Sequence, residues 1–340
     1  MQRILIPVLL IAAMLTSCGK GSKINFDVDV SNIKADVALE RFDLDFDTLT
    51  PQNVYSALPA MTAKYGDFFD FYLGAIIHLP EVEDSEFQDG LEAFQKYCLE
   101  NKIRDGVQKF FPGNESLEPL FDEGFRHFRY YFPNDSLPKI YTVCSGYQES
   151  LFPTDNIVAF ALDKYLGANW PCYADNVLKI DNYKRQKMTK AMMPVDYFRT
   201  YAMLNYPKSD DIPDNLLTEM IYKGRIQYFL KSMMPSAPDS LLWGYSSVNY
   251  QWASAYEDEI WTYLVSKNLL FETNSLTIKN LTGEGPFTNV FGNASAPGAA
   301  SFCGFGIVCS FVQRNPQVSL KQLMSISNLQ DIYNQSRYNP

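Results

Sequence analysis

The chain has 340 residues, of which 46% are hydrophobic and 15% aromatic, and its formal net charge at pH 7 is −10. It can bury a large core, as one large domain or two closely packed ones; because no low-complexity linker or internal repeat divides it, we predict one globular domain over residues 25–340. The acidic charge argues against a nucleic-acid partner, which would need clustered Lys and Arg to neutralise phosphates.

The first residues are predicted to be an export signal. Arg3 precedes an apolar run, 4–15, that is shorter than the ~20 residues a membrane-spanning helix needs. The stretch Leu15-Thr16-Ser17-Cys18-Gly19 resembles a bacterial lipobox, in which a peptidase cuts before the cysteine and the cysteine carries the lipid. We therefore predict a lipoprotein signal peptide over 1–17, a lipid on Cys18 that anchors the chain to the membrane, and a tether over 18–24. An ordinary cleavage site before a cysteine is the alternative.

Residue spacing predicts an α+β fold that is mainly helical and has a small mixed sheet. Alternation of apolar and polar residues favours a half-exposed strand over 26–30, and two β-rich runs, 138–144 and 156–162, are expected to be neighbouring strands. Helical spacing occurs in the following stretches: 51–75, 120–132, 216–230, 248–267, 297–312 and 319–338.

The stretch 216–230 is the best candidate for a central helix. Pro213 and Asp214 suit its first turn, and its apolar residues are spread widely enough for a helix that is covered on most sides. Gly224 lies in the middle, where glycine costs ~1 kcal/mol relative to alanine. We therefore expect close contact with another element at Gly224.

Three alternating acids, Asp43, Asp45 and Asp47, invite a calcium-binding interpretation. An EF-hand loop would need glycine and glutamate where Thr48 and Val54 stand. A solvated face is therefore expected instead.

No metal or cofactor site is predicted elsewhere either. His78 and His127 are the only histidines and lie far apart in the sequence, which favours packing or surface roles. Gly304-Phe305-Gly306 lacks the third glycine of a dinucleotide-binding fingerprint, because Cys309 stands there. Besides Cys18 there are five cysteines, an odd number without a Cys-x-x-Cys pair, so no disulfide framework is implied: Cys98, Cys144, Cys172, Cys303 and Cys309.

Several short stretches, in order along most of the chain, resemble the gliding motility-associated lipoprotein GldB family of Bacteroidetes. They are Arg41-Phe-Asp43, Tyr65-Gly-Asp-Phe-Phe69, Leu217-x-Glu219-Met-Ile-Tyr-Lys-Gly224, Gly244-Tyr245, Glu259-Ile-Trp261, Ser295-Ala-Pro-Gly298 and Ser336-Arg-Tyr-Asn-Pro340. The resemblance implies an outer-membrane lipoprotein that faces the periplasm and is linked, in gliding relatives, to assembly of the motility and secretion apparatus. Envelope, motility or secretion proteins are the implied partners, and no reaction is implied.

The order of elements also resembles, more weakly, that of zincin peptidases, whose active helix carries His-Glu-x-x-His. In this chain the register that keeps the glutamate gives Thr218, Glu219 and Tyr222, so both histidine ligands are absent. The resemblance therefore implies a peptidase-like scaffold without zinc, in which Thr218, Glu219 and Tyr222 mark a degenerate cleft. The alternative is structural: Glu219 pairs with a nearby cation, and Tyr222 belongs to the core.

Three functions follow as hypotheses. The first is a non-catalytic binding or assembly factor of the envelope. The second is a metal-independent hydrolase of an envelope polymer, in which Glu219, Asp163 and Asp181 would converge, since paired carboxylates suffice for glycoside hydrolysis. The third is a glycan-binding lipoprotein, suggested by 22 tyrosines and four tryptophans.

Overall fold

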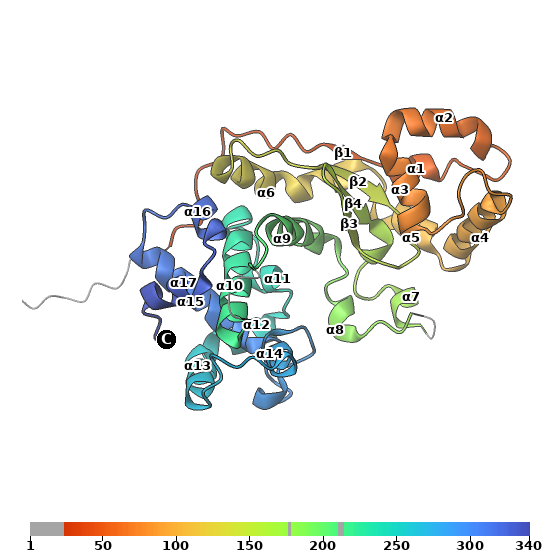
Figure 1. Cartoon of the computed structure of the whole chain (residues 1–340). Helices are drawn as coiled ribbons and strands as arrows, with labels where there is room; N and C mark the ends of the chain where they lie inside the picture. The colour runs from red at the N-terminus through yellow and green to blue at the C-terminus, as the bar shows by residue number, and fades with distance from the viewer. Residues whose placement is uncertain (1–23, 176–177, 210–213) are drawn as a thin grey trace, which may run out of the picture.

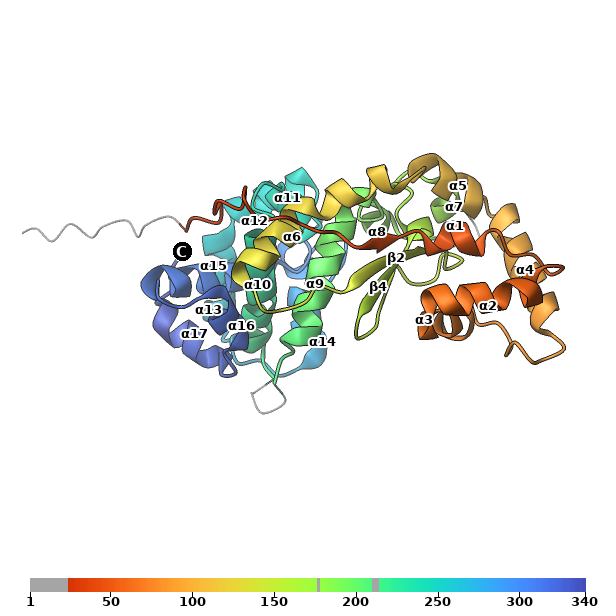
Figure 2. The same cartoon turned by 90° about the horizontal axis from the view of Figure 1, so that it is seen from above.

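The structure is a computed structural model that describes residues 24–175, 178–209 and 214–340. The predicted signal peptide, Cys18, the tether up to Lys23, and Pro213 lie outside the described residues. The molecule is elongated, with helices α1 to α5 (residues 42–110) at one end and the helices after residue 214 at the other (Figures 1 and 2). Among the described residues, no helix is both long and apolar enough to cross a bilayer.

A mixed four-stranded sheet has the order β1-β2-β4-β3. Its strands are β1 (Leu39–Glu40), β2 (Lys139–Val143), β3 (Leu151–Pro153) and β4 (Ile157–Ala161). β1, β2 and β4 run parallel, while β3 pairs with β4 in the antiparallel direction. The structure thus confirms the α+β class and the pairing of the two predicted strands.

Both faces of β2 and β4 are covered, because successive side chains point to opposite faces of a strand. Tyr141 and Ala159, which are directly opposite each other, contribute to a core on one face. Ile140 and Val158 contribute to a larger core on the other face. The sheet is therefore a wall between two apolar cores, which explains why both strands read as nearly continuous apolar runs.

The smaller core is aromatic and lies under helices formed by residues 42–100. These are α1 (Phe42–Phe46), α2 (Val54–Tyr65), α3 (Asp67–Phe71), the π-helix Tyr72–Ile76 and α4 (Phe87–Glu100). The Phe42 ring is at its centre, with the rings of Tyr65, Phe68 and Tyr72 at 4.7 to 5.2 Å between centroids. The predicted helical stretch 51–75 is thus confirmed as three consecutive helical segments.

Of the three alternating acids at the start of this region, Asp47 is exposed and Asp45 is partly exposed, but Asp43 does not lie on a solvated face. Asp43 is buried and accepts two hydrogen bonds from the Arg41 guanidinium, at 2.8 and 2.7 Å. Thr142 of β2 also donates to Asp43, and Arg41 donates to the carbonyl of Phe111 at 2.9 Å. The expectation of a solvated face was wrong for Asp43, because the alternating pattern does not reveal that Arg41 supplies a buried counter-charge.

The predicted strand over 26–30 was also wrong. The segment pairs with no strand, although its side chains alternate between half-buried and exposed. It runs along the helical end of the molecule towards β1 (Figure 2), and the Phe26 ring packs 4.9 Å from that of Tyr228. Alternating burial against helices produces the same sequence pattern as a strand, so the pattern could not distinguish them.

Five further α-helices of the described chain lie between residues 103 and 205. They are α5 (Ile103–Phe110), α6 (Glu118–Tyr131), α7 (Pro171–Ala174), α8 (Asn182–Arg185) and α9 (Met193–Asn205). Two of them, α6 and α9, pack against α10 (Leu216–Met233). α6 confirms the predicted helix over 120–132, and its Phe121, Phe125 and Phe128 are buried in the larger core.

From residue 214 to residue 340, a range that the structure describes throughout, the regular elements are all helices. They are α10 (Leu216–Met233), α11 (Asp239–Trp243), α12 (Ser247–Ala255), α13 (Glu257–Ser266), α14 (Ser275–Thr282), α15 (Ala299–Arg314), α16 (Leu320–Ser325) and α17 (Leu329–Ser336). The stretches 248–267 and 319–338, each predicted as one helix, are each divided into two helices. The sequence did not show these breaks, because the apolar spacing continues across them.

α10 is the central helix that the sequence predicts, and α15 is its main neighbour. Its N-cap is Asn215, whose side chain accepts from the Thr218 N–H at 3.0 Å, so Asp214 precedes the helix rather than lying in its first turn. A Cβ atom at Gly224 would overlap the backbone of Gly304 in α15, and one at Gly304 would overlap the carbonyl of Met220. The expected close contact at Gly224 is therefore confirmed as a backbone-to-backbone crossing.

We predict that Gly304→Ala lowers the free energy of unfolding by about 3 kcal/mol, because the two helices must separate to admit a methyl group. Gly74→Ala is the matched control, since a Cβ there meets nothing within 4 Å, and it should leave the free energy of unfolding unchanged or raise it by up to about 1 kcal/mol. Urea denaturation of both variants measures the difference. Equal effects would contradict the proposed close crossing.

We predict that Asp43→Ala lowers the free energy of unfolding by about 3 to 5 kcal/mol, because it leaves the Arg41 charge buried and unpaired. Asp122→Ala removes a carboxylate of similar type from an exposed pair with Arg126 and should cost less than about 1 kcal/mol. The same denaturation experiment applies, and a small loss for Asp43→Ala would show that the pair contributes little.

Candidate functional site

A pocket of about 250 Å³ lies beside the crossing of α10 and α15. Its walls come from α9, α10, α11, the loop after α14 and the start of α15. The lining residues are Lys187, Arg199, Met203, Glu219, Tyr222, Lys223, Ile226, Gln227, Trp243, Tyr245, Thr282, Gly283, Glu284, Pro297, Gly298 and Ser301. Segments more than a hundred residues apart in the sequence therefore contribute to one cavity.

Glu219, Tyr222 and Lys223 face the pocket together because residues three and four apart share a face of a helix. Another part of the wall is the start of α15, where Gly298 has φ +58° and forms the N-cap. A Cβ atom at Gly298 would lie 2.8 Å from the Thr282 carbonyl oxygen, so both the backbone conformation and the close approach favour glycine.

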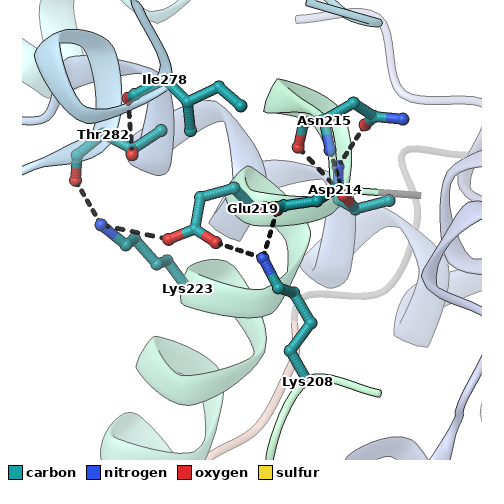
Figure 3. Close-up of polar contacts among 8 residues, drawn as sticks. Lys208, Asp214, Asn215, Glu219, Lys223, Ile278 and Thr282 are labelled. Atoms are coloured by element: carbon teal, nitrogen blue, oxygen red, sulfur yellow. Dashed lines mark hydrogen bonds and ion pairs between the residues drawn. The ribbon is translucent and has the colours of Figure 1, made fainter. Parts of the chain in front are cut away.

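Glu219 is held between two ammonium groups (Figure 3). Its Oε2 lies 3.1 Å from Nζ of Lys208, and its Oε1 lies 3.4 Å from Nζ of Lys223. Lys223 also donates to the Thr282 carbonyl at 2.7 Å, and Lys208 pairs with Asp214 at 2.6 Å. Both carboxylate oxygens of Glu219 are therefore engaged in ion pairs.

Thr218 has a different place from the other two predicted cleft residues. It is 1% exposed, its N–H donates to the Asn215 side chain, and its hydroxyl accepts from the Asn215 N–H at 3.2 Å. It thus completes a capping box that begins α10. Glu219 and Tyr222 line the pocket, whereas Thr218 is absent from the lining.

A second group of charges lies on the other side of the pocket. Lys187 pairs with Glu284 at 3.0 Å, and Arg199 donates to the Leu242 carbonyl at 2.8 Å. Burial alone would raise the pKa of Glu284, but the charges of Lys187, Arg199 and Lys223 lower it below its ordinary value. No sequence signal indicated this group, because Lys187 and Glu284 are 97 positions apart.

Two aromatic residues complete the pocket wall. The Trp243 and Tyr245 rings are stacked, with 5.4 Å between centroids and 21° between planes. The Tyr245 hydroxyl donates to the Pro297 carbonyl at 2.6 Å, and burial raises the pKa of Tyr245. The pocket therefore combines a rigid aromatic surface with paired charges of both signs, which is suited to holding a ligand in one orientation.

The three carboxylates of the hydrolase hypothesis do not share a pocket. Asp163 is fully buried and accepts from the backbone N–H groups of Ser145 and Tyr147, at 3.0 and 2.5 Å. Asp181 pairs with Lys184 at the exposed start of α8. Only Glu219 faces the pocket.

The histidines of the described residues contact backbone carbonyls one helical turn before them, and His78 also contacts Gln148. The His127 ring is 2.9 Å from the Glu123 carbonyl, and the His78 ring is 3.2 Å from that of Gly74. In the part of the chain that the structure describes, no group of three or more His, Cys, Asp or Glu is placed to hold a metal ion. The five cysteines there are all free thiols.

We predict that Glu219→Ala lowers the free energy of unfolding by about 1 kcal/mol, because Lys208 and Lys223 each lose a partner in a partly buried site. Glu100→Ala is the control, since its side chain is 62% exposed and its pair with Lys96 spans 3.9 Å. It should change stability by less than about 0.5 kcal/mol. Thermal and urea unfolding of both variants give the comparison; a neutral Glu219→Ala would contradict the ion-pair interpretation.

Comparison with known proteins identifies the chain at the level of its family. A sequence model described as gliding motility protein GldB matches residues 23–340. No curated protein and no solved structure matches the chain. The zincin resemblance gains no support from these comparisons, and α10 has helices rather than the sheet as its main neighbours. Since the match covers nearly all of the sequence, the protein belongs to the GldB family.

Proposed function

We propose that the protein is a lipid-anchored component of the outer membrane, faces the periplasm, and acts by binding another envelope component rather than by catalysing a reaction. The lipobox-like stretch that ends at Cys18 supports the anchor. The basic start of the tether, Gly19-Lys-Gly-Ser-Lys23, favours the periplasmic face. The family to which the chain belongs supports a role in gliding motility or a related envelope process.

One observation carries the binding role. Three separate stretches on which the family resemblance rests meet in the pocket: 217–224 through Glu219 and Tyr222, 244–245 through Tyr245, and 295–298 through Gly298. A cavity with aromatic and polar walls is the usual form of a ligand site. The convergence therefore supports this pocket as the place where a ligand or a segment of a partner is held.

The polar groups of the pocket favour binding over chemistry. The hydroxyls of Thr282, Ser301 and Tyr245 donate to backbone carbonyls rather than to a base. Both lining carboxylates, Glu219 and Glu284, are paired with lysines. Activation of a nucleophile would need a base within hydrogen-bond reach of a hydroxyl or thiol, and none of these three hydroxyls has one.

A glycan-binding role is the second candidate, and the stacked Trp243 and Tyr245 favour it. The test is to titrate the native protein and the Trp243→Ala variant with envelope polysaccharides and to follow the tryptophan fluorescence of each. A glycan-binding protein should respond, and the variant should respond less. Absence of any response in the native protein would remove this candidate.

Anchoring is tested with Cys18→Ala in the full-length chain. We expect the native protein to incorporate radiolabelled palmitate and to fractionate with the outer membrane, and the variant to do neither. Cys172→Ala is the control for loss of a cysteine and should behave like the native protein. Palmitate incorporation by the Cys18→Ala variant would contradict the assignment.

The binding role is tested by complementation of a deletion strain. Glu219→Gln keeps the size and hydrogen-bonding ability of the side chain, so a binding protein should retain function, whereas a hydrolase that uses this carboxylate should lose it. Tyr222→Ala opens the pocket wall and should reduce complementation. Immunoblots and melting curves confirm that both variants are present and folded; the opposite pattern, loss with Glu219→Gln and retention with Tyr222→Ala, would overturn the proposal.

A further inference from the structure

Gln227 is a buried polar residue in the pocket beside the crossing of α10 and α15. It lies two turns beyond Glu219 on the same face of the helix, lines the pocket, and is 6% exposed. Among the residues that the structure describes, none forms a hydrogen bond with its side-chain amide. The amide is not sealed in the core, and the surface that it keeps opens into the pocket. A ligand in the pocket can therefore reach the amide of Gln227.

An amide that is buried without partners costs free energy, which packing alone does not return. The neighbouring Ile226, which also lines the pocket, shows that the helix can carry an apolar residue at this level. The amide of Gln227 offers both an acceptor oxygen and a donor nitrogen. A group of this kind, kept accessible and without a partner in the described chain, points to a ligand that both donates and accepts hydrogen bonds.

Two more neutral polar groups belong to the same lining. Tyr222 and Trp243 are half-buried, and their side chains line the pocket. In the described ranges, the Tyr222 hydroxyl and the Trp243 Nε1–H form no hydrogen bond. A ligand that binds to Gln227 thus meets a hydroxyl group and an indole N–H group in the same pocket.

The charged groups of the lining, by contrast, already have partners. The ion pairs and their N···O distances are Lys223–Glu219 at 3.4 Å, Lys187–Glu284 at 3.0 Å and Arg199–Asp196 at 4.0 Å. An ionic ligand would have to compete with one of these pairs, whereas a neutral ligand would meet groups that lack a partner in the described chain. The arrangement therefore favours an uncharged ligand.

The aromatic wall favours a peptide over a glycan. The rings of Tyr245 and Phe302 lie nearly parallel to the Trp243 ring, with centroids 5.4 and 5.2 Å away and interplanar angles of 21° and 31°. Phe305 approaches the same ring edge-on, at 6.0 Å and 89°. Because neighbouring rings already occupy the face of the indole, little of it remains for a sugar to stack on. The Nε1–H at the edge of the indole can still donate to a carbonyl.

An extended peptide matches the neutral groups. Each of its residues carries one N–H and one C=O, and in a strand the two groups of one residue point to the same side. One side-chain amide can therefore accept from the N–H and donate to the C=O of the same residue. Met203, which is 49% exposed, and Ile226 add apolar surface to the pocket. The volume of about 250 Å³ limits the contact to a short stretch of chain.

We propose, building on the binding role proposed above, that this pocket holds one residue of an extended, uncharged segment of a partner protein. Gln227 accepts from the N–H and donates to the C=O of that residue, while Met203 and Ile226 contact its apolar side chain. The Tyr222 hydroxyl and the Trp243 Nε1–H donate to carbonyls of the flanking residues.

A measurement on the native full-length protein in detergent tests the proposal. The probe is N-acetyl-leucine N-methylamide, because it carries the N–H and C=O of one residue and no charge. It should shift the side-chain NH₂ resonances of Gln227 and the indole resonance of Trp243 in ¹⁵N NMR spectra, with a Kd of about 1 mM for a ligand of this size. A Gln227 resonance that does not respond would overturn the proposal.

Two matched compounds separate the peptide from other ligands. The same compound methylated on the leucine nitrogen cannot donate to Gln227, so it should bind about tenfold more weakly. N-acetylglucosamine should bind more weakly than the peptide compound. Equal binding of the two leucine compounds, or tighter binding of the sugar, would each overturn the proposal, and the second result would assign the pocket to a glycan.

A variant places the binding at Gln227. Gln227→Met keeps the length of the side chain and should weaken binding of the peptide compound by about tenfold. Since the amide has no partner among the described residues, this variant should melt at the native temperature or above it, which a structural role of the amide would not allow. Gln52→Met changes an exposed glutamine just before α2 and should bind normally. Unchanged affinity in Gln227→Met would overturn the assignment.

Complementation separates failure of the ligand class from failure of the binding role. If Tyr222→Ala reduces complementation but the native protein does not respond to the peptide compound, the binding role stands and the peptide ligand is wrong. If Tyr222→Ala complements fully, the binding role of the pocket is itself wrong, and the peptide ligand falls with it.

Discussion

The arrangement of the helical half depends on the place where α10 and α15 touch through glycine backbones. Gly224 and Gly304 leave no room for a side chain, so the distance between the helix axes is set by the backbones themselves. Interiors packed to crystal-like density transmit such a constraint to every neighbour. The helices α9, α13, α14 and α17 pack around this pair, and the pocket beside the crossing inherits its dimensions from it.

Two charged residues of α10, Glu219 and Arg225, have different surroundings. Glu219, near the start of the helix, is neutralised by Lys208 and Lys223; the pair with Lys208 ties α10 to the segment before it, whereas Lys223 lies one turn further along the same helix. Arg225, nearly two turns further along, is almost completely buried; the contacts of its guanidinium with described residues are a hydrogen bond to the Ile326 carbonyl and the Tyr222 ring. A fully buried helix usually carries neither kind of group, because each costs desolvation energy that packing does not return. The two groups thus mark where α10 has a role beyond filling the core.

Much of this architecture could be predicted from the sequence, because strong periodicity is a local property. The central helix, the close contact at Gly224 and the two neighbouring strands all follow from spacing and composition. The segment 26–30 could not be assigned correctly, since its alternating burial arises from packing on Tyr228, which lies about two hundred residues away. Asp43 was mistaken for a solvated acid for a similar reason, because its partners are distant in the sequence. Thr142 donates a hydrogen bond to Asp43, and Arg41, which pairs with Asp43, donates to the Phe111 carbonyl. At the site, Glu219 and Tyr222 were found through the resemblance, whereas Lys187 and Glu284 meet only in the folded chain.

The sheet that separates the two cores has a consequence for the order in which the chain folds. Leu39 of β1 pairs with Ile140 of β2, and β2 pairs in turn with β4, which ends at Ala161. The aromatic helices of residues 42–100 therefore have no complete sheet to pack on until β2 and β4, which end at Val143 and Ala161, are also available. Contacts between such distant segments are formed late, because closing a long loop must precede them. While the chain is held extended, for example during transport across a membrane, the aromatic core around Phe42 would be exposed. The first hundred residues can become stable only after the chain up to about residue 161 is free to fold.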